Sequence, residues 1–370
     1  MASLPLQGLT VVAIEQAVAA PFSSSRLADA GARVIKIERP EGDFARGYDD
    51  VAKGQSSYFV WLNRGKESLT LDLSRPEGQA ELARLLDGAD VLIQNLKRGA
   101  LARLGFDFAR LARDWPRLIT CSITGYGEDG PMADRKAYDL LIQAESGLCS
   151  ITGGPDEPAR VGISLVDIAT GATAYAAILE ALIGRAATGK GANISVSMFD
   201  VMAEWLTVPL LNHEAGKTPR RLGMVHPSIA PYGVFSTRDG QRVLISVQSD
   251  REWRKLAQLF LDQPELGDDP RFATNVARVR NRAQTDAAVA AGFARRDADD
   301  AVAALLRADV ALASVSDMEQ LSRHPHLRRI TVETPNGPVS YPAPAPVFLG
   351  EDRDYGAVPA QAEASQPKQG

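Results

Sequence analysis

The sequence predicts an α/β fold in which helices cover both faces of a parallel β-sheet. Over roughly the first half of the chain, short runs rich in β-branched residues alternate with segments of helical periodicity. Glycine or proline stands where these segments begin or end, as at Gly8, Pro21, Gly31 and Pro76. Strands that alternate with helices form parallel sheets, because each helix carries the chain back to the start of the next strand.

The expected strands are apolar runs bounded by turn signals. Residues 11–14 read Val-Val-Ala-Ile after the Gly8 turn, and residues 33–38 read Arg-Val-Ile-Lys-Ile-Glu after Gly31. The predicted strands are residues 11–14, 33–38, 90–95, 117–124, 163–166 and 193–198. The predicted helices are residues 21–30, 79–86, 168–183 and the segment after 198 through 205. The result is a Rossmann-like sheet in a large domain.

The pattern changes beyond His213, where a smaller α+β domain is expected over residues 215–325. Residues 232–247 form two alternating runs around Asp239-Gly240, a strong hairpin signal, and residues 256 to about 313 are helical and charged. The large domain is expected to span residues 1–198 and to be completed by 330–370, with linkers at 199–214 and 326–329. The tail from Glu351 is rich in Pro, Ala, Gln and Ser, which predicts loose order.

Charge and cysteine content limit the classes of function. The net charge of −5 and the pI near 5.6 argue against nucleic acid or an anionic membrane as a partner. No run of about eighteen uninterrupted apolar residues is present, and residues 1–20 do not read as a secretory signal. The two cysteines, Cys121 and Cys149, stand among apolar or small residues and are expected to be packing residues. We therefore expect a cytoplasmic protein.

The common cofactor and hydrolase signatures are missing. Neither G-x-G-x-x-G after a strand nor G-x-x-x-x-G-K-[ST] occurs, which argues against a nicotinamide, flavin or NTP cofactor. The four histidines are too scattered for a zinc site, so no metal is expected, and no G-x-S-x-G elbow is present. Small residues at 15–21 would let a ligand's phosphates or pantetheine approach the backbone. Tight turn packing explains the same residues equally well.

Asp167 is the carboxylate with the most unusual setting. It stands between the predicted strand 163–166 and a long alanine-rich helix, at the sheet edge where α/β proteins bind ligands. The helix N-terminus is expected to favour the ionised form, which a nucleophile requires. The alternative is that Asp167 only caps the helix by accepting a backbone N–H near Thr170.

Several short runs occur together in one order. They are VIKIERP at 34–40, NRGK at 63–66, LDL at 71–73, PEG at 76–78, DVLIQN at 90–95, Leu104-Gly105, Gly125-Tyr-Gly127, Tyr138-Asp139-x-x-x-Gln143-x-x-x-Gly147, the segment from Gly162 through Asp167 to Gly171, and Gly189-Lys-Gly191. Over residues 6–200 this ordered set resembles the class III CoA-transferase family. Weaker similarity at Asp239-Gly240 and Asn281-Arg282 extends through the small lobe.

The resemblance implies an enzyme that moves coenzyme A from an acyl-CoA to a free carboxylic acid through a covalent aspartyl-CoA thioester on Asp167. It implies CoA contacts at Gln16, Ala17, Val18, Arg39, Leu71, Leu73, Ser74, Asn95, Leu96, Arg103, Lys136, Ala137, Tyr138 and Asp139. The cations Arg39, Arg103 and Lys136 would suit the phosphates of CoA, although solvated surface cations are the plain alternative. The resemblance also implies a homodimer of interlocked chains.

Departures from the family pattern bear on the substrate. The glycine-rich loop of formyl-CoA transferases is absent, which argues against formate or oxalate, and Ser74 stands where some relatives carry lysine. The segment 226–232 resembles transferases of short dicarboxylates such as succinate, mesaconate, itaconate or citramalate. There His226 is expected either to contact the distal carboxylate or to make only a backbone hydrogen bond.

Two other functions remain open at this point. An α-methylacyl-CoA racemase shares the family's fold but needs a histidine where this chain has Tyr138, and a phenol of ordinary pKa is a poor base. A catalytically silent CoA-binding subunit is the third candidate, and the presence of Asp167 argues against it.

Overall fold

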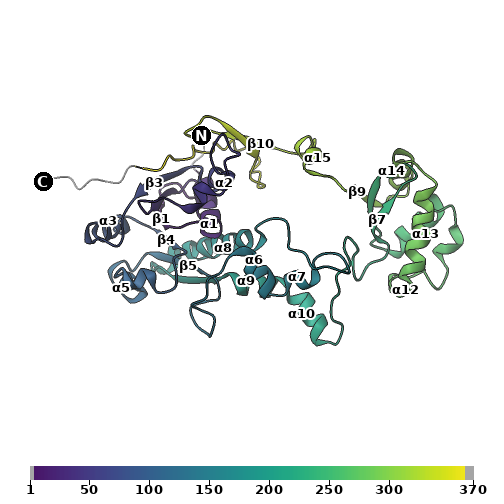
Figure 1. The fold of residues 1–370 in the computed structure, drawn as a ribbon, viewed down its shortest axis with the longest axis horizontal. Helices are drawn as coiled ribbons and strands as arrows, with labels where there is room; N and C mark the ends of the chain where they lie inside the picture. Colours follow the sequence, from purple (N-terminus) through teal and green to yellow (C-terminus); the bar gives the residue numbers. More distant parts are fainter. Residues whose placement is uncertain (1–3, 363–370) are drawn as a thin grey trace. The chain divides into compact units, whose positions relative to one another are not determined.

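The computed structural model describes residues 4–362 and contains a six-stranded parallel sheet (Figure 1). Its strands are β1 (Thr10–Ile14), β2 (Arg33–Glu38), β3 (Lys66–Thr70), β4 (Val91–Gln94), β5 (Ile119–Thr124) and β6 (Asn193–Ser197). They pair in the order β3-β2-β1-β4-β5-β6, so the strand order reverses between β1 and β4. The predicted parallel α/β sheet is confirmed. In such sheets ligands bind at the carboxyl ends of the strands near the reversal.

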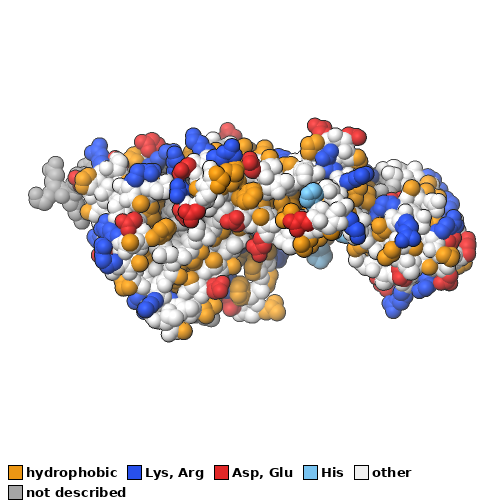
Figure 2. Space-filling model, turned by 90° about the horizontal axis from the view of Figure 1, so that it is seen from below, with side chains coloured by type: hydrophobic (Ala, Val, Ile, Leu, Met, Phe, Trp, Pro, Cys, Tyr) orange, Lys and Arg blue, Asp and Glu red, His pale blue; other side chains and the backbone are white. Residues whose placement is uncertain are grey.

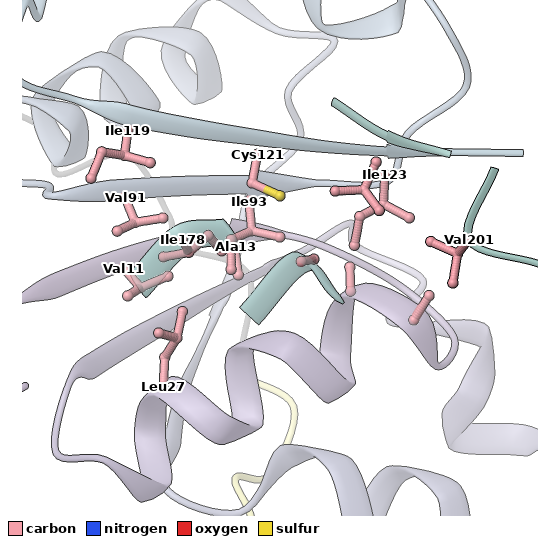
Figure 3. Close-up of a cluster of buried hydrophobic side chains, with 14 of the residues drawn as sticks. Val11, Ala13, Leu27, Val91, Ile93, Ile119, Cys121, Ile123, Ile178 and Val201 are labelled. Carbon is pink, nitrogen blue, oxygen red and sulfur yellow. The ribbon is translucent and has the colours of Figure 1, made fainter. Parts of the chain in front are cut away.

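Alternate residues of the central strands face two separate cores. Val11 and Ala13 of β1 belong to the core that α1 (Ala19–Asp29) and α8 (Leu165–Thr188) cover, whereas Val12 and Ile14 belong to the core beneath α3 (Pro76–Leu86). Figure 3 shows side chains of β1, β4 and β5 gathered with Leu27 of α1 and Ile178 of α8. Burial on both faces explains why these strands read as nearly continuous apolar runs.

Shorter helices connect the strands and extend beyond the sheet. They are η1 (Phe44–Gly47), α2 (Ser57–Asn63), α4 (Ala100–Arg103), α5 (Phe108–Asp114), α6 (Asp139–Glu145), α7 (Leu148–Ile151), α9 (Met198–Trp205) and α10 (Thr207–Glu214). Both cysteines are free, and Cys121 lies buried in the core. Among the described residues α8 is the one helix long and apolar enough to cross a membrane, by length and composition alone. It packs against α1, β5 and β6, as core helices do.

Two details of the sheet differ from the prediction. Residues 163–166 are not a strand, because α8 begins at Leu165 and Ile163 is exposed. A run of four apolar residues does not by itself distinguish a buried strand from the first turn of a helix. The edge strand β3 was not predicted, because its sequence KESLT contains one β-branched residue and no clear alternation.

The chain divides into two compact units. The first contains residues 1–149, 160–211 and 328–370, and the second contains residues 150–159 and 212–327. The prediction had assigned residues 150–159 to the large domain. They belong with the second unit because the Arg221 guanidinium donates to the carbonyl groups of Ser150, Gly154 and Pro155.

The second unit joins a three-stranded antiparallel sheet to a group of helices. The strands β7 (Tyr232–Ser236) and β8 (Arg242–Ser246) form the predicted hairpin, with Gly240 at φ +78° in its turn, and β9 (Ala311–Ser314) pairs with β8. The helical elements are α11 (Asp250–Leu259), η2 (Pro264–Gly267), α12 (Asn275–Arg280), α13 (Arg282–Ala294), α14 (Ala298–Arg307) and α15 (Met318–Ser322). The prediction had missed β9 by extending the helical region to residue 313. Trp253, Phe260 and Phe293 form much of this unit's own core.

The end of the chain completes the first unit. The strands β10 (Arg329–Val332) and β11 (Val339–Pro342) pair, and Val332 packs with Phe59 of α2. The tail was predicted to be loosely ordered, and residues 351–362 contain no helix or strand, but residues 357–362 are held against the rest of the first unit. Gly65 donates to the carbonyl of Ala357, and the hydroxyl of Thr70 donates to that of Ala362, so this segment runs along the β3 edge of the sheet. The rest of the tail lies outside the described residues.

Candidate active site

Asp167 is the third residue of α8, and a second carboxylate caps the helix. Asp139, the first residue of α6, accepts the backbone N–H groups of Val166 and Asp167 on Oδ1, at 2.7 and 3.2 Å. Residue 164 holds the N-cap position, and the hydroxyl of Thr170 donates to the carbonyl of Val166. Asp167 is therefore not the cap of its own helix, and its carboxylate does not bind the N–H groups of the first turn.

Gln143 fixes the capping carboxylate. Its side-chain amide donates to Asp139 Oδ2 at 2.6 Å, and its Oε1 accepts the backbone N–H of Val161 at 2.9 Å. Gln143 is fully buried. The amide thus ties the segment before α8 to the first turn of α6, and it holds Asp139 at the helix start.

The electrostatic setting of Asp167 differs from the expectation. Burial, together with the nearby Asp139 carboxylate, raises the pKa of Asp167 to about 7. The helix N-terminus was expected to favour the ionised form, but its N–H groups are taken by Asp139. Within residues 4–362, no hydrogen bond lowers the pKa of Asp167. The group therefore changes charge near neutral pH.

The turn after β1 lies beside the start of α8. Gly171 allows this approach, since a Cβ there would clash with the carbonyl oxygen of Ala19 and lie 2.8 Å from the Cβ of Phe22. Val18 and Phe22 share a small apolar cluster with Ile168, the residue after Asp167. The first turns of α1 and α8 therefore stand side by side, after the carboxyl end of β1. Figure 1 shows the two helices next to each other.

Hydrogen bonds hold the β1 turn in an unusual conformation. Asn95 pins Gln16 twice, since its Oδ1 accepts the Gln16 N–H at 3.0 Å and its Nδ2 donates to the Gln16 carbonyl at 2.8 Å. Ala17 has φ +64°, in the left-handed region that favours glycine, and its N–H donates to Asp43 Oδ1 at 3.2 Å. Four of the predicted CoA contacts, Gln16, Ala17, Val18 and Asn95, thus meet at one turn.

A cavity of about 230 Å³ opens at the ends of β1 and β2. Six of the predicted contacts line it, and these are Gln16, Arg39, Leu71, Leu73, Ser74 and Leu96. Arg39 is half exposed, and its Nε donates to the carbonyl of Gly42 at 3.1 Å. The structure thereby brings together residues from four separate segments.

Arg103 faces a different cavity. A space of about 440 Å³ beyond β4 is lined by Arg103 together with Lys97, Arg98, Phe106 and Phe108. The sequence analysis had not singled out Lys97 or Arg98. Arg98 forms an ion pair with Asp134 at 3.4 Å, so cations and aromatic rings from a short segment surround this second space.

The predicted residues 136–138 lie on the connection that leads into α6. Lys136 and Tyr138 are exposed, and Ala137 packs closely on Gly125. Tyr48, which the sequence analysis missed, lies near this point. Burial and the nearby Asp43 and Asp167 carboxylates raise its pKa to about 12. No local sequence signal marks Tyr48, because it follows a short 3-10 turn far from Asp167 in the chain.

His226 belongs to the second unit. Its N–H donates to the carbonyl of Tyr232 at 3.1 Å, its Nδ1 accepts the N–H of Ser228, and its ring stacks on Tyr232. Arg282 donates to the carbonyl of His226 at 2.8 Å. The backbone hydrogen bond weighed as one role for His226 is therefore present. Among residues 4–362, no group of three or more His, Cys, Asp or Glu side chains is arranged to hold a metal ion.

The sheet, the β1 turn and the ordered sequence runs define the class. The chain belongs to CoA-transferase family III, whose model matches residues 6–368, and the resemblance noted in the sequence is confirmed. The protein is a CoA-transferase, an enzyme class that uses CoA thioesters as substrates.

The relatives cover nearly the whole chain. It is 35% identical to a succinate–glutarate CoA-transferase of Agrobacterium fabrum, over 99% of this chain and 93% of that one. It is 37% identical to an acetyl-CoA:oxalate CoA-transferase of Acetobacter aceti, over 94% and 90%. A crystal structure of a CAIB/BAIF family protein from Brucella suis matches with a TM-score of 0.82 and 38% identity, over 98% of this chain and 97% of that one.

Proposed function

We propose that this enzyme moves CoA from an acyl-CoA to a short dicarboxylate through a thioester on Asp167. The proposal rests on the position of the Asp167 carboxylate and on its freedom from a capping role. It stands at the start of α8 beside the β1 turn, while Asp139 takes the capping role that would otherwise occupy it. Among the residues that the structure describes, no hydrogen bond or ion pair engages the Asp167 carboxylate, so it is available to attack a substrate.

The proposed steps conserve atoms and charge. An oxygen of ionised Asp167 attacks the thioester carbonyl carbon, the C–S bond breaks, and CoA leaves as a thiolate from a mixed aspartyl–acyl anhydride. The thiolate then attacks the aspartyl carbonyl carbon, which forms the aspartyl-CoA thioester and releases the donor acid as a carboxylate. The acceptor carboxylate repeats these steps in reverse and departs as its CoA thioester.

The CoA would lie along the edge formed by the strand ends. The cavity lined by Gln16, Arg39 and Ser74 is the proposed nucleotide site, and Arg39, Arg103 and Lys136 would meet its phosphates. The pantetheine would extend toward Asp167 along Ala137, Tyr138 and Asp139. Ser74 carries no charge, so a phosphate contact there would be a neutral hydrogen bond.

The relatives support a dicarboxylate as the acceptor. The two named above act, by their names, on succinate and glutarate or on oxalate, all of which are dicarboxylic acids. Succinate, mesaconate, itaconate and citramalate are the proposed acceptors, and His226 would contact the distal carboxylate. Lack of the glycine-rich loop argues against oxalate, but one relative is named for oxalate. A panel of labelled acids should therefore include oxalate. If only aromatic or long-chain acids accepted CoA, the dicarboxylate assignment would be wrong.

The decisive experiment traps the intermediate. Succinyl-CoA incubated without an acceptor should leave a hydroxylamine-sensitive CoA adduct on the peptide that contains Asp167. Asp167→Asn should abolish both adduct and turnover, whereas Asp299→Asn, at an exposed site in the second unit, should change neither. An α-methylacyl-CoA racemase would instead exchange the α-hydrogen for solvent deuterium and form no adduct. A silent subunit would do neither, and transferase activity retained in Asp167→Asn would overturn the mechanism.

A further inference from the structure

Four charged side chains are buried together beneath the cavity at the ends of β1 and β2. They are Glu15, Lys36, Asp43 and Lys66, and none of these side chains is exposed. Lys66 Nζ lies 2.7 Å from Glu15 Oε1, and Lys36 Nζ lies 2.8 Å from Asp43 Oδ2 and 3.7 Å from Glu15 Oε1. We call these four residues the buried charge cluster.

The cluster is balanced in charge and in hydrogen bonds. It holds two carboxylates and two ammonium groups. Burial acts to raise the pKa of Glu15, but Lys66 and Lys36 outweigh burial and lower it. Lys66 also donates to the carbonyl of Pro21 and to Asn63 Oδ1, and Ser24 donates to Glu15 Oε2. Removal of one member would leave an unpaired charge in the interior, which is costly.

Asp43 connects this cluster to the β1 turn. Its Oδ1 accepts the N–H of Ala17 at 3.2 Å and the N–H of Ala45 at 2.9 Å, while its Oδ2 binds Lys36. Ala17 holds a backbone conformation that an L-residue adopts only when the surroundings enforce it. The turn therefore depends on a carboxylate that Lys36 in turn holds in place.

Glu15 and Asp43 also line the cavity. The cluster thus extends from the cavity wall to the start of α1, which packs on α8 next to Asp167. A shift of Asp43 would move the backbone that forms this wall.

We propose that Asp43 and Lys36 are positioning residues for CoA binding, which hold the Ala17 turn in the conformation that receives CoA. The inference rests on the proposed function, since it takes the turn to be part of the CoA site. Neither side chain is assigned a part in the chemistry at Asp167.

The test compares charge variants by calorimetric titration with free CoA, a measurement that needs no turnover. Asp43→Asn places an amide N–H₂ or a misplaced oxygen against the Lys36 ammonium, and we expect the Kd for CoA to rise about tenfold. The double variant Lys36→Met/Asp43→Asn removes the ammonium as well, so the amide oxygen can accept the two N–H groups again. We expect its Kd to return to within about threefold of the wild type.

Asp90→Asn is the matched control. Asp90 also accepts a backbone N–H, from Thr10 at 2.8 Å, and pairs with a cation, Arg185 at 2.8 Å, but at the opposite end of β1. It should lower stability and leave the Kd for CoA unchanged. If wild type binds CoA and the folded Asp43→Asn variant binds it equally tightly, the positioning role is wrong while the proposed function stands. If the double variant is no better than Asp43→Asn, the coupling through Lys36 is wrong. If the wild type binds no CoA, both proposals are wrong.

Discussion

Two carboxylates at the start of α8 divide two tasks between them. Asp139 accepts the helix N–H groups, and Asp167 is left with a raised pKa of about 7. Like charges near one another disfavour ionisation, and burial adds to the effect. A carboxylate with a raised pKa is a stronger nucleophile than an ordinary carboxylate once ionised, but it is ionised in only part of the population near neutrality. The buried position of Asp167 thus lowers the stability of the folded protein near neutral pH and raises the reactivity of the ionised carboxylate.

Asp167→Asn should therefore stabilise the folded protein at pH 8. The folded pKa lies above the unfolded value, so the unfolded state gains from ionisation as pH rises from about 4 to 7, and wild-type stability falls over that range. The neutral amide avoids this loss. We expect about 1–3 kcal/mol of added unfolding free energy at pH 8, shrinking steadily as pH falls toward 4. Urea titrations across pH measure it, and a less stable variant at pH 8 would contradict the electrostatic account.

Asp139→Asn should shift the pH dependence of the reaction. Burial is the larger cause of the raised pKa, but removal of the neighbouring charge also lowers the pKa of Asp167, so the rate of adduct formation should stay high to a lower pH than in the wild type. Tyr48 faces the same group but stays neutral over this range, since its pKa is raised to about 12. Single-turnover rates from pH 5 to 9 measure the shift. An unchanged profile would show that Asp139 does not set the charge of Asp167.

At the scale of elements, the close approach of α1 and α8 positions the site. Gly171 lies where α8 meets the carbonyl of Ala19, so the two helices approach more closely than a side chain would allow. The approach brings the turn at Val18 next to Ile168. Helix packing, rather than any single polar contact, places Asp167 beside the turn.

Gly171→Ala should destabilise the fold by about 1–3 kcal/mol, because the added Cβ forces α1 and α8 apart. Gly184→Ala on the same helix is the control. No atom lies within 4 Å of its Cβ position, so it should stabilise the helix by up to about 1 kcal/mol. Chemical denaturation of both variants gives the comparison. Equal changes in unfolding free energy would mean that helix propensity alone, and not the contact with α1, determines the effect of both substitutions.

Local signals were sufficient for the central sheet and insufficient for the edges and the site. The runs at β1, β2 and β4 were found because nearly all of their residues are buried and most are apolar, although β2 also contains the buried Lys36. The edge strand β3 carries no such signal. The buried charge cluster joins residues 15, 36, 43 and 66, and only the completed sheet brings them into contact. The role of Gln143 was invisible for the same reason, since its partners come from two other segments.

At the scale of the molecule, several large apolar side chains on the first unit remain exposed. Val51, Ile183, Val208 and Leu349 are each more than three-fifths exposed. On the face seen in Figure 2, apolar side chains lie among Lys, Arg, Asp and Glu of both signs. Apolar side chains scattered in this way are ordinary on protein surfaces, so the expectation of a dimer rests on the family resemblance.

We expect the protein to sediment as a dimer at micromolar concentration, with twice the chain mass of 39.7 kDa. A simple dimer and the interlocked dimer implied by the family resemblance differ in how readily they exchange chains. Mixed tagged and untagged dimers should form hybrids only after unfolding if the chains are interlocked. A stable monomer would contradict the first expectation, and rapid hybrid formation under native conditions would contradict the second.

The hydrogen bonds of residues 357–362 to β3 and its neighbours have a consequence for biosynthesis. The first unit is made from three stretches of chain, and its third stretch leaves the ribosome after the other two and after the second unit. The second unit lies almost wholly within one stretch, so it can fold while translation continues. Asp167 and the β1 turn emerge early, but the unit that holds them is complete only after the stretch that begins at residue 328 has emerged. A chain that stops before residue 328 should therefore contain a folded second unit and an incomplete first unit.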